Sequence, residues 1–188
     1  LSYRFLLALS DGIAHFGLEH HESSDDRIPE RGILDEDERH SRATLLSHEF
    51  VHSWNGKYRR PADNATPDYQ TPMRTSLLWV YEGLTEYLGE VLAARSGLWT
   101  PQDYRDAMAI TAAWAGEHVG RTWRPLEDTA VSAQLLFEAR QDWEDWGRSV
   151  DFYDESSLVW LDADTLIRKK TNGAKSLEDF IHAFHGAP

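Results

Sequence analysis

The sequence predicts a mostly helical domain with a small β element at its N-terminus. Apolar side chains recur at helical spacing from about residue 40 onward, and strand-like segments occur only in the first 21 residues. The chain has 188 residues, 41% of them hydrophobic, which is enough for one sizeable core and too short to assume two independent domains. We therefore expect a single domain over residues 1–188.

The β element comes first in the chain. Residues 3–9 alternate apolar side chains well enough to predict a strand, and residues 17–21 could form a second strand or an edge segment. Residues 22–39 are polar and contain a proline and a glycine, so we expect an exposed loop there. Its last acidic residues, 35–38, sit just before a helical pattern, where negative charge favours a helix N-terminus.

The rest of the chain is expected to be helical apart from a proline-containing loop over residues 57–74. Asn55-Gly56 and Gly97 are typical ends of the first two helices, and Thr100-Pro101 is a typical start of the third. The patterns predict these helices: about 40–54, 77–96, 101–118, 132–146 and 154–171, and a short one after Ser176.

Composition excludes several classes of protein. The formal charge of −13, with no cluster of Lys and Arg, argues against nucleic acid or an anionic membrane as partner. No apolar run reaches the roughly 18 residues of a spanning helix. The absence of Cys removes disulfides, a thiolate nucleophile and Cys-ligated metals. The chain lacks an initiator Met and a signal-peptide pattern, so we expect a piece of a longer protein, with its compartment and oligomeric state open.

Residues 48–52, His-Glu-Phe-Val-His, form an HExxH motif inside the first strong helical pattern. Positions i and i+4 share one helical face, so the imidazoles of His48 and His52 can reach one metal ion. Glu49 lies beside them and is suited to take a proton from water at the metal. The alternative is a surface helix with two solvated histidines.

A catalytic zinc site needs a third protein ligand, and the next helix offers Glu82. A carboxylate on an otherwise apolar helix is costly unless it is paired or binds metal. Its neighbour Gly83 allows another backbone to approach closely. Glu86, one turn further on, could accept a hydrogen bond from a zinc-binding imidazole. The alternative is that both glutamates form a solvated face of an amphipathic helix.

The segments HEFVHSWNGKYRRP (48–61) and LLWVYEGLTEYLG (77–89) resemble the bacterial glycyl aminopeptidase family of zinc peptidases, which is related to aminopeptidase N and has a thermolysin-like catalytic domain. The resemblance extends to residues 17–23, 119–129 and 149–186. It implies one zinc ion held by His48, His52 and Glu82. Family members usually carry an N-terminal β-domain and a C-terminal PDZ domain, for which this chain has no room, so we expect an isolated catalytic domain.

The resemblance also implies two roles in catalysis and substrate binding. Glu19 would bind the substrate's α-amino group, and Tyr153 would donate a hydrogen bond to the oxyanion. Two positions depart from the pattern: Phe16 stands where the family commonly has Gly, and Ser156 stands where the aminopeptidase N relatives have Gly. The alternative for Glu19 is a structural pairing with an arginine of the β element, and the alternative for Tyr153 is an ordinary aromatic at a helix start.

Three functional hypotheses follow. The first is a zinc-dependent aminopeptidase that removes N-terminal residues, Gly or Ala by the family resemblance, from peptides with a free N-terminus. The second is a zinc endopeptidase of thermolysin type, which would not need Glu19. The third is a metal-binding fragment that is inactive without the domains missing from this chain.

Overall fold

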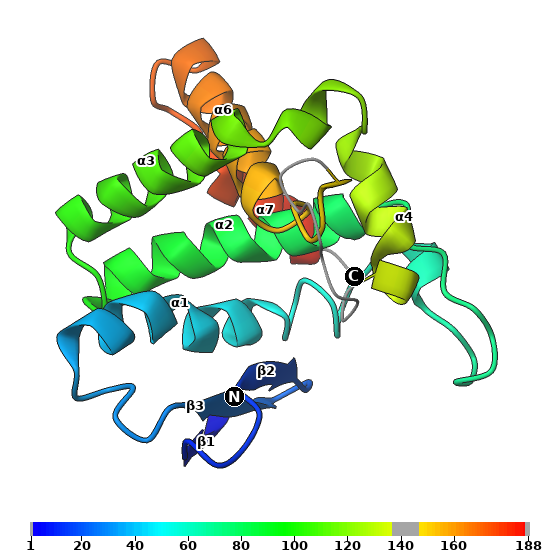
Figure 1. The fold of residues 1–188 in the computed structure, drawn as a ribbon. Helices are drawn as coiled ribbons and strands as arrows, with labels where there is room; N and C mark the ends of the chain where they lie inside the picture. Colours follow the sequence, from blue (N-terminus) through cyan, green and yellow to red (C-terminus); the bar gives the residue numbers. More distant parts are fainter. Residues whose placement is uncertain (1, 137–146, 187–188) are drawn as a thin grey trace. The chain divides into compact units, whose positions relative to one another are not determined.

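The computed structural model describes residues 2–136 and 147–186, which form two compact units. One unit comprises Leu1–Arg59 and Leu88–Ala107, and the other comprises Arg60–Tyr87 and Met108–Pro188. Helix α2 runs through both (Figure 1). The elements of the described residues are β1 (Arg4–Leu9), β2 (Phe16–Glu19), β3 (Ser23–Ile28), α1 (Glu36–Val51), α2 (Leu78–Ser96), α3 (Pro101–Glu117), α4 (Leu126–Leu136), α6 (Asp154–Lys170) and α7 (Leu177–His185), with short 3-10 helices at Ala62–Asn64 and Val119–Thr122.

The sheet of the first unit has the strand order β1-β3-β2, so β3 is the central strand. β3 pairs in parallel with β1 and antiparallel with β2. The expectation of a loop over 22–39 was therefore wrong for residues 23–28. The sequence SSDDRI has no apolar alternation because the buried face of β3 carries Ser24 and Asp26, whose side chains hydrogen-bond to each other at 2.7 Å. The ladder with two neighbouring strands outweighs the weak strand propensity of these residues.

Helix α1 packs across β2 and β3 and also against α2 (Figure 1). The Tyr3 hydroxyl, just before β1, donates a hydrogen bond to the carbonyl of Glu49 in α1. The Ser47 hydroxyl donates to the Gly89 carbonyl of α2 at 2.7 Å. A Cβ added at Gly89 would lie 3.1 Å from the His48 Cα, so glycine permits this close approach. The HExxH part of α1 is therefore held between the sheet and α2.

In the second unit, the N-terminal half of α2 packs against α6. The Trp160 indole donates to the Val80 carbonyl at 3.2 Å, and the Tyr87 hydroxyl donates to Asp164 at 3.0 Å. A Cβ added at Gly83 would lie only 2.1 Å from the Ser156 Cβ. The close backbone approach expected at Gly83 is thus confirmed, and the element that approaches is α6.

The mostly helical fold with a small N-terminal β element is confirmed, and the differences other than β3 lie at helix boundaries. α1 begins at Glu36 and ends at Val51, whereas the pattern predicted about 40–54. Helix α4 begins at Leu126 rather than near 132, and the remainder of the helix predicted over 132–146 lies outside the described residues from 137 onward. Within the described part of the chain, no helix has the length and apolar character needed to cross a membrane.

Candidate active site

Two histidines of α1 and one glutamate of α2 lie together. The Nε2 atoms of His48 and His52 are 3.1 Å apart, as their i, i+4 spacing predicts. Each of His48, His52 and Glu82 brings one possible ligand atom to within 4.8 Å of the others. The contact of Ser47 with Gly89 explains the approach of the two helices, because Glu82 lies two turns before Gly89 on the same continuous helix.

This donor set fits a zinc ion. Two Zn–N bonds of 2.0–2.1 Å at a tetrahedral angle place the nitrogens about 3.3 Å apart, close to the observed 3.1 Å between His48 and His52. Two imidazoles and one carboxylate leave a fourth coordination position open, as in catalytic zinc sites. Glu82 is only 8% exposed, and a metal ion is one partner that offsets the cost of burying a carboxylate.

The orientation of His52 is fixed by the turn that follows α1. Its Nδ1 lies 3.0 Å from the carbonyl oxygen of Asn55, so Nδ1–H donates and the lone pair of Nε2 faces His48. A backbone carbonyl is a usual second partner of a metal-binding imidazole. The sequence predicts this kind of role for Glu86. For His52 the acceptor is the Asn55 carbonyl, and the role of Glu86 stays a prediction.

Glu49 lies buried between α1 and β2, with 5% of its surface exposed. A Cβ added at Gly17 of β2 would lie 2.0 Å from its Oε1, so the carboxyl rests directly on the glycine backbone. Its Oε2 has no hydrogen-bond partner among the described residues. Burial raises the pKa of Glu49 to about 7, against the lowering effect of the two histidines. A carboxyl with this pKa can both accept and release a proton near neutral pH.

Glu19 lies on β2 two residues after Gly17 and therefore on the same face of the strand. Its Oε1 is 3.2 Å from the Nζ of Lys57, and both side chains are about one quarter exposed. The family resemblance implies a substrate ammonium as the partner of Glu19, and the alternative is an arginine of the β element. The structure places a lysine there, and neither the strand pattern nor the motif predicted it.

Tyr153 and Glu86 lie in the second unit. Tyr153 directly precedes α6, is half-buried, and its ring centroid is 4.6 Å from that of Phe152. Three residues later, Ser156 is the residue in contact with Gly83. Tyr153 is therefore one turn from the point where α6 meets the helix that carries Glu82.

Asp154 is a partly buried acidic residue of this unit that the sequence patterns do not single out. Burial, together with the nearby carboxylates of Glu86 and Asp151, raises the pKa of Asp154 to about 6. His118, whose Nδ1 is 2.8 Å from the Trp114 carbonyl oxygen, opposes this rise. In the sequence Asp154 is an ordinary acidic residue in the first turn of a helix, and its partial burial becomes visible only in the packed structure.

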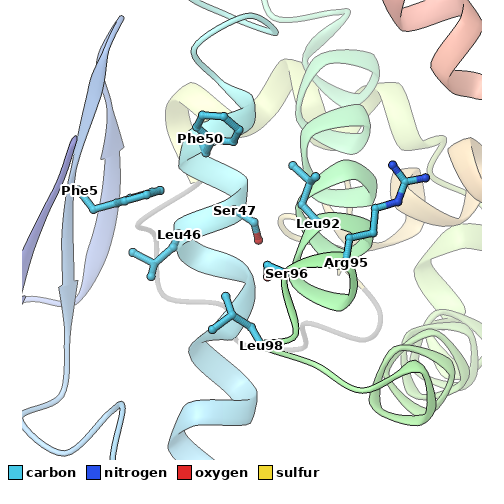
Figure 2. Close-up of a pocket in the computed structure, with 8 residues that line it drawn as sticks. All are labelled: Phe5, Leu46, Ser47, Phe50, Leu92, Arg95, Ser96 and Leu98. Atoms are coloured by element: carbon cyan, nitrogen blue, oxygen red, sulfur yellow. The ribbon is translucent and has the colours of Figure 1, made fainter. Parts of the chain in front are cut away.

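A mostly apolar hollow of about 410 Å³ lies in the first unit, lined by residues of β1, α1 and the C-terminal half of α2. Figure 2 shows Phe5 of the sheet reaching toward α1, with Phe50 of α1 and Leu92 of α2 on its other walls. Phe50 is the residue of the HExxH motif that lines it, and none of the three possible metal ligands does.

Residues 41–159 match the family model described as M61 glycyl aminopeptidase. Because this match covers well over half of the chain, the protein belongs to the M61 glycyl aminopeptidase family. Of the predicted site residues, all except Glu19 lie within the matched range.

The fold is also similar to that of an aminopeptidase N family protein from Idiomarina loihiensis, with a TM-score of 0.83 and 24% sequence identity. The similarity covers 94% of this chain and 31% of that one, so this chain spans about a third of the length of that protein. At this identity the similarity establishes the fold. A search of curated proteins found no match.

Proposed function

We propose that this protein is a zinc-dependent aminopeptidase that removes N-terminal residues, preferentially Gly or Ala, from peptides. The observation that carries the proposal is the cluster of His48, His52 and Glu82 with the buried carboxyl of Glu49 beside it, in a chain of the M61 family. The preference for Gly or Ala rests on the family. We further propose that residues 1–188 act as one catalytic domain.

The proposed reaction assigns each residue one task. Zinc held by His48, His52 and Glu82 would act as a Lewis acid on the scissile carbonyl and lower the pKa of water. The Glu49 carboxylate takes a proton from the attacking water and passes it to the leaving amine. Its contact with Gly17 limits the directions in which it can turn, which favours a fixed proton path.

The remaining two residues handle the substrate. Tyr153 donates a hydrogen bond to the oxygen on which negative charge develops. Glu19 binds the α-ammonium of the substrate, so the peptide bond next to the N-terminus is the one placed for cleavage. Supporting this role, Glu19 shares a strand face with Gly17, and residues i and i+2 of a strand lie about 7 Å apart.

The test compares Glu49→Gln with wild type after zinc loading, using a glycine anilide as substrate. We expect unchanged zinc content and fold but loss of hydrolysis, because a general base contributes chemistry and not coordination. Glu36→Gln is the matched control, because Glu36 lies on the same helix and its side chain is 81% exposed. Hydrolysis by Glu49→Gln near the wild-type rate would contradict the assignment.

A second measurement separates the alternatives. Wild type is given one peptide with a free N-terminus and the same peptide N-acetylated. An aminopeptidase cleaves only the free form efficiently, whereas a thermolysin-type endopeptidase cleaves both. Stoichiometric zinc with hydrolysis of neither peptide would favour the third hypothesis, a metal-binding fragment.

A further inference from the structure

We propose that the ammonium group of Lys57 occupies, in the substrate-free protein, the position where Glu19 receives the α-ammonium of the substrate. Lys57 would thereby set the affinity of the site for free N-termini. This inference rests on the proposed aminopeptidase function, and it adds a residue that competes with the substrate for its anchor.

Lys57 is placed by the turn that closes α1. Its backbone N–H donates to the carbonyl of His52 at 2.9 Å. Gly56 has a φ of +145°, which favours glycine, and its N–H donates to the Arg59 carbonyl at 2.6 Å. The turn therefore fixes the backbone of Lys57 to the end of the helix that carries both histidines, while its side chain extends to β2.

The pairing itself identifies the kind of ligand. Lys57 Nζ lies 3.2 Å from Glu19 Oε1. A lysine side chain and a peptide N-terminus both end in a primary ammonium with three N–H donors on a carbon chain. A carboxylate that accepts one at this distance has the geometry to accept the other.

The contact is suited to exchange. Both side chains are about one quarter exposed, and ion pairs near the surface contribute little to stability. Lysine also has a flexible stem that can turn its charge into solvent. By contrast, Arg27 on the central strand holds Asp25 through two hydrogen bonds, of 3.2 and 2.7 Å, a fork geometry that is harder to displace.

The position of the pair connects it to the proposed chemistry. Glu19 lies two residues from Gly17 on the same face of β2, and the Glu49 carboxyl rests on Gly17. An ammonium at Glu19 is therefore next to the proposed general base, where the first residue of a peptide substrate has to lie.

The experiment measures KM and kcat for a free-amine glycine anilide in Lys57→Met, Lys57→Arg and wild type. Lys57→Met removes the competing charge, so KM should fall by up to about fivefold, the ratio expected for a surface pair, with kcat nearly unchanged. Lys57→Arg keeps a competing cation, so KM should not fall. Lys175→Met is the matched control, because it removes one positive charge in the other unit.

A binding measurement provides a readout that does not depend on turnover. Calorimetry compares glycine amide with N-acetylglycine amide, and Lys57→Met should bind only the former more tightly than wild type does. The ¹⁵N signal of the Lys57 side chain should shift on addition of glycine amide and stay in place with the acetylated form. These data decide the inference even if the protein proves inactive.

An unchanged or raised KM in Lys57→Met, together with unchanged glycine amide affinity, overturns the role of Lys57. If wild type meanwhile still prefers the free peptide to the blocked one, the aminopeptidase proposal stands and only the inference fails. If wild type cleaves both forms equally, the proposed function fails, and the inference fails with it.

Discussion

Gly17→Ala tests whether the position of Glu49 matters for hydrolysis. A Cβ at residue 17 would lie 2.0 Å from Glu49 Oε1, whereas an ordinary contact begins at 3.4 Å. The carboxyl oxygen must therefore move by about 1.4 Å, the difference between these two distances. A misplacement of about 1 Å can lower a rate about 100-fold, so we expect kcat to fall by roughly that factor. The fold should persist, because the displaced atoms end a flexible side chain.

The assay is steady-state hydrolysis of a glycine anilide, with zinc content and thermal unfolding measured on the same preparations. Gly12→Ala is the matched control, because a Cβ there meets its nearest neighbour, Ser10 Oγ, at an ordinary 3.6 Å. The control should keep wild-type kcat. The reasoning is refuted if Gly17→Ala retains zinc and a kcat within about threefold of wild type, since Glu49 would then tolerate displacement.

Three further predictions concern the second helix and its neighbours. Gly83→Ala should lower the free energy of unfolding by about 1–3 kcal/mol, measured in urea, because the new Cβ lies 2.1 Å from Ser156; Ser156→Gly in the same chain should restore part of it. Asp154→Asn should raise the free energy of unfolding above pH 6 by about 1–3 kcal/mol, because the folded protein disfavours the ionised carboxyl. This gain should vanish below about pH 4, where the carboxyl is protonated in both states. A gain in unfolding free energy that does not depend on pH would contradict the reasoning. Glu82→Gln should lose zinc in a chelator competition, whereas Glu86→Gln should keep it with an affinity about 10- to 100-fold lower; equal retention by Glu82→Gln and wild type argues against Glu82 as a ligand.

The helices could be predicted from sequence because their signals are local. Gly97 ends α2 with a φ of +83°, and Ser176 starts α7 with a capping box formed with Asp179. The grouping of His48 and His52 also follows from helical spacing alone. The grouping of Glu82 with the two histidines could be predicted only from the cost of a carboxylate on an apolar helix, together with the resemblance to the glycyl aminopeptidase family.

The features that sequence analysis missed depend on contacts between distant residues. The central strand β3 has polar residues on its buried face, so its alternation is invisible to a hydrophobicity pattern. The pairing of Glu19 with Lys57 joins residues 38 positions apart through a turn whose path no local signal predicts. The partial burial of Asp154 likewise arises from packing, since acidic residues at helix starts are normally solvated.

Asp164 on α6 has a consequence for how the C-terminal end of the chain unfolds. One of its oxygens accepts the backbone N–H of Leu177, at the start of α7, at 2.6 Å. The other accepts the Tyr87 hydroxyl of α2 and the guanidinium of Arg168. Because a single carboxylate connects three helices, opening of the first turn of α7 disturbs the same Asp164 side chain that accepts the hydrogen bond of the Tyr87 hydroxyl. Amide exchange at Leu177 should therefore follow the slow opening of the α2–α6 contact rather than the rapid fraying usual for a terminal helix.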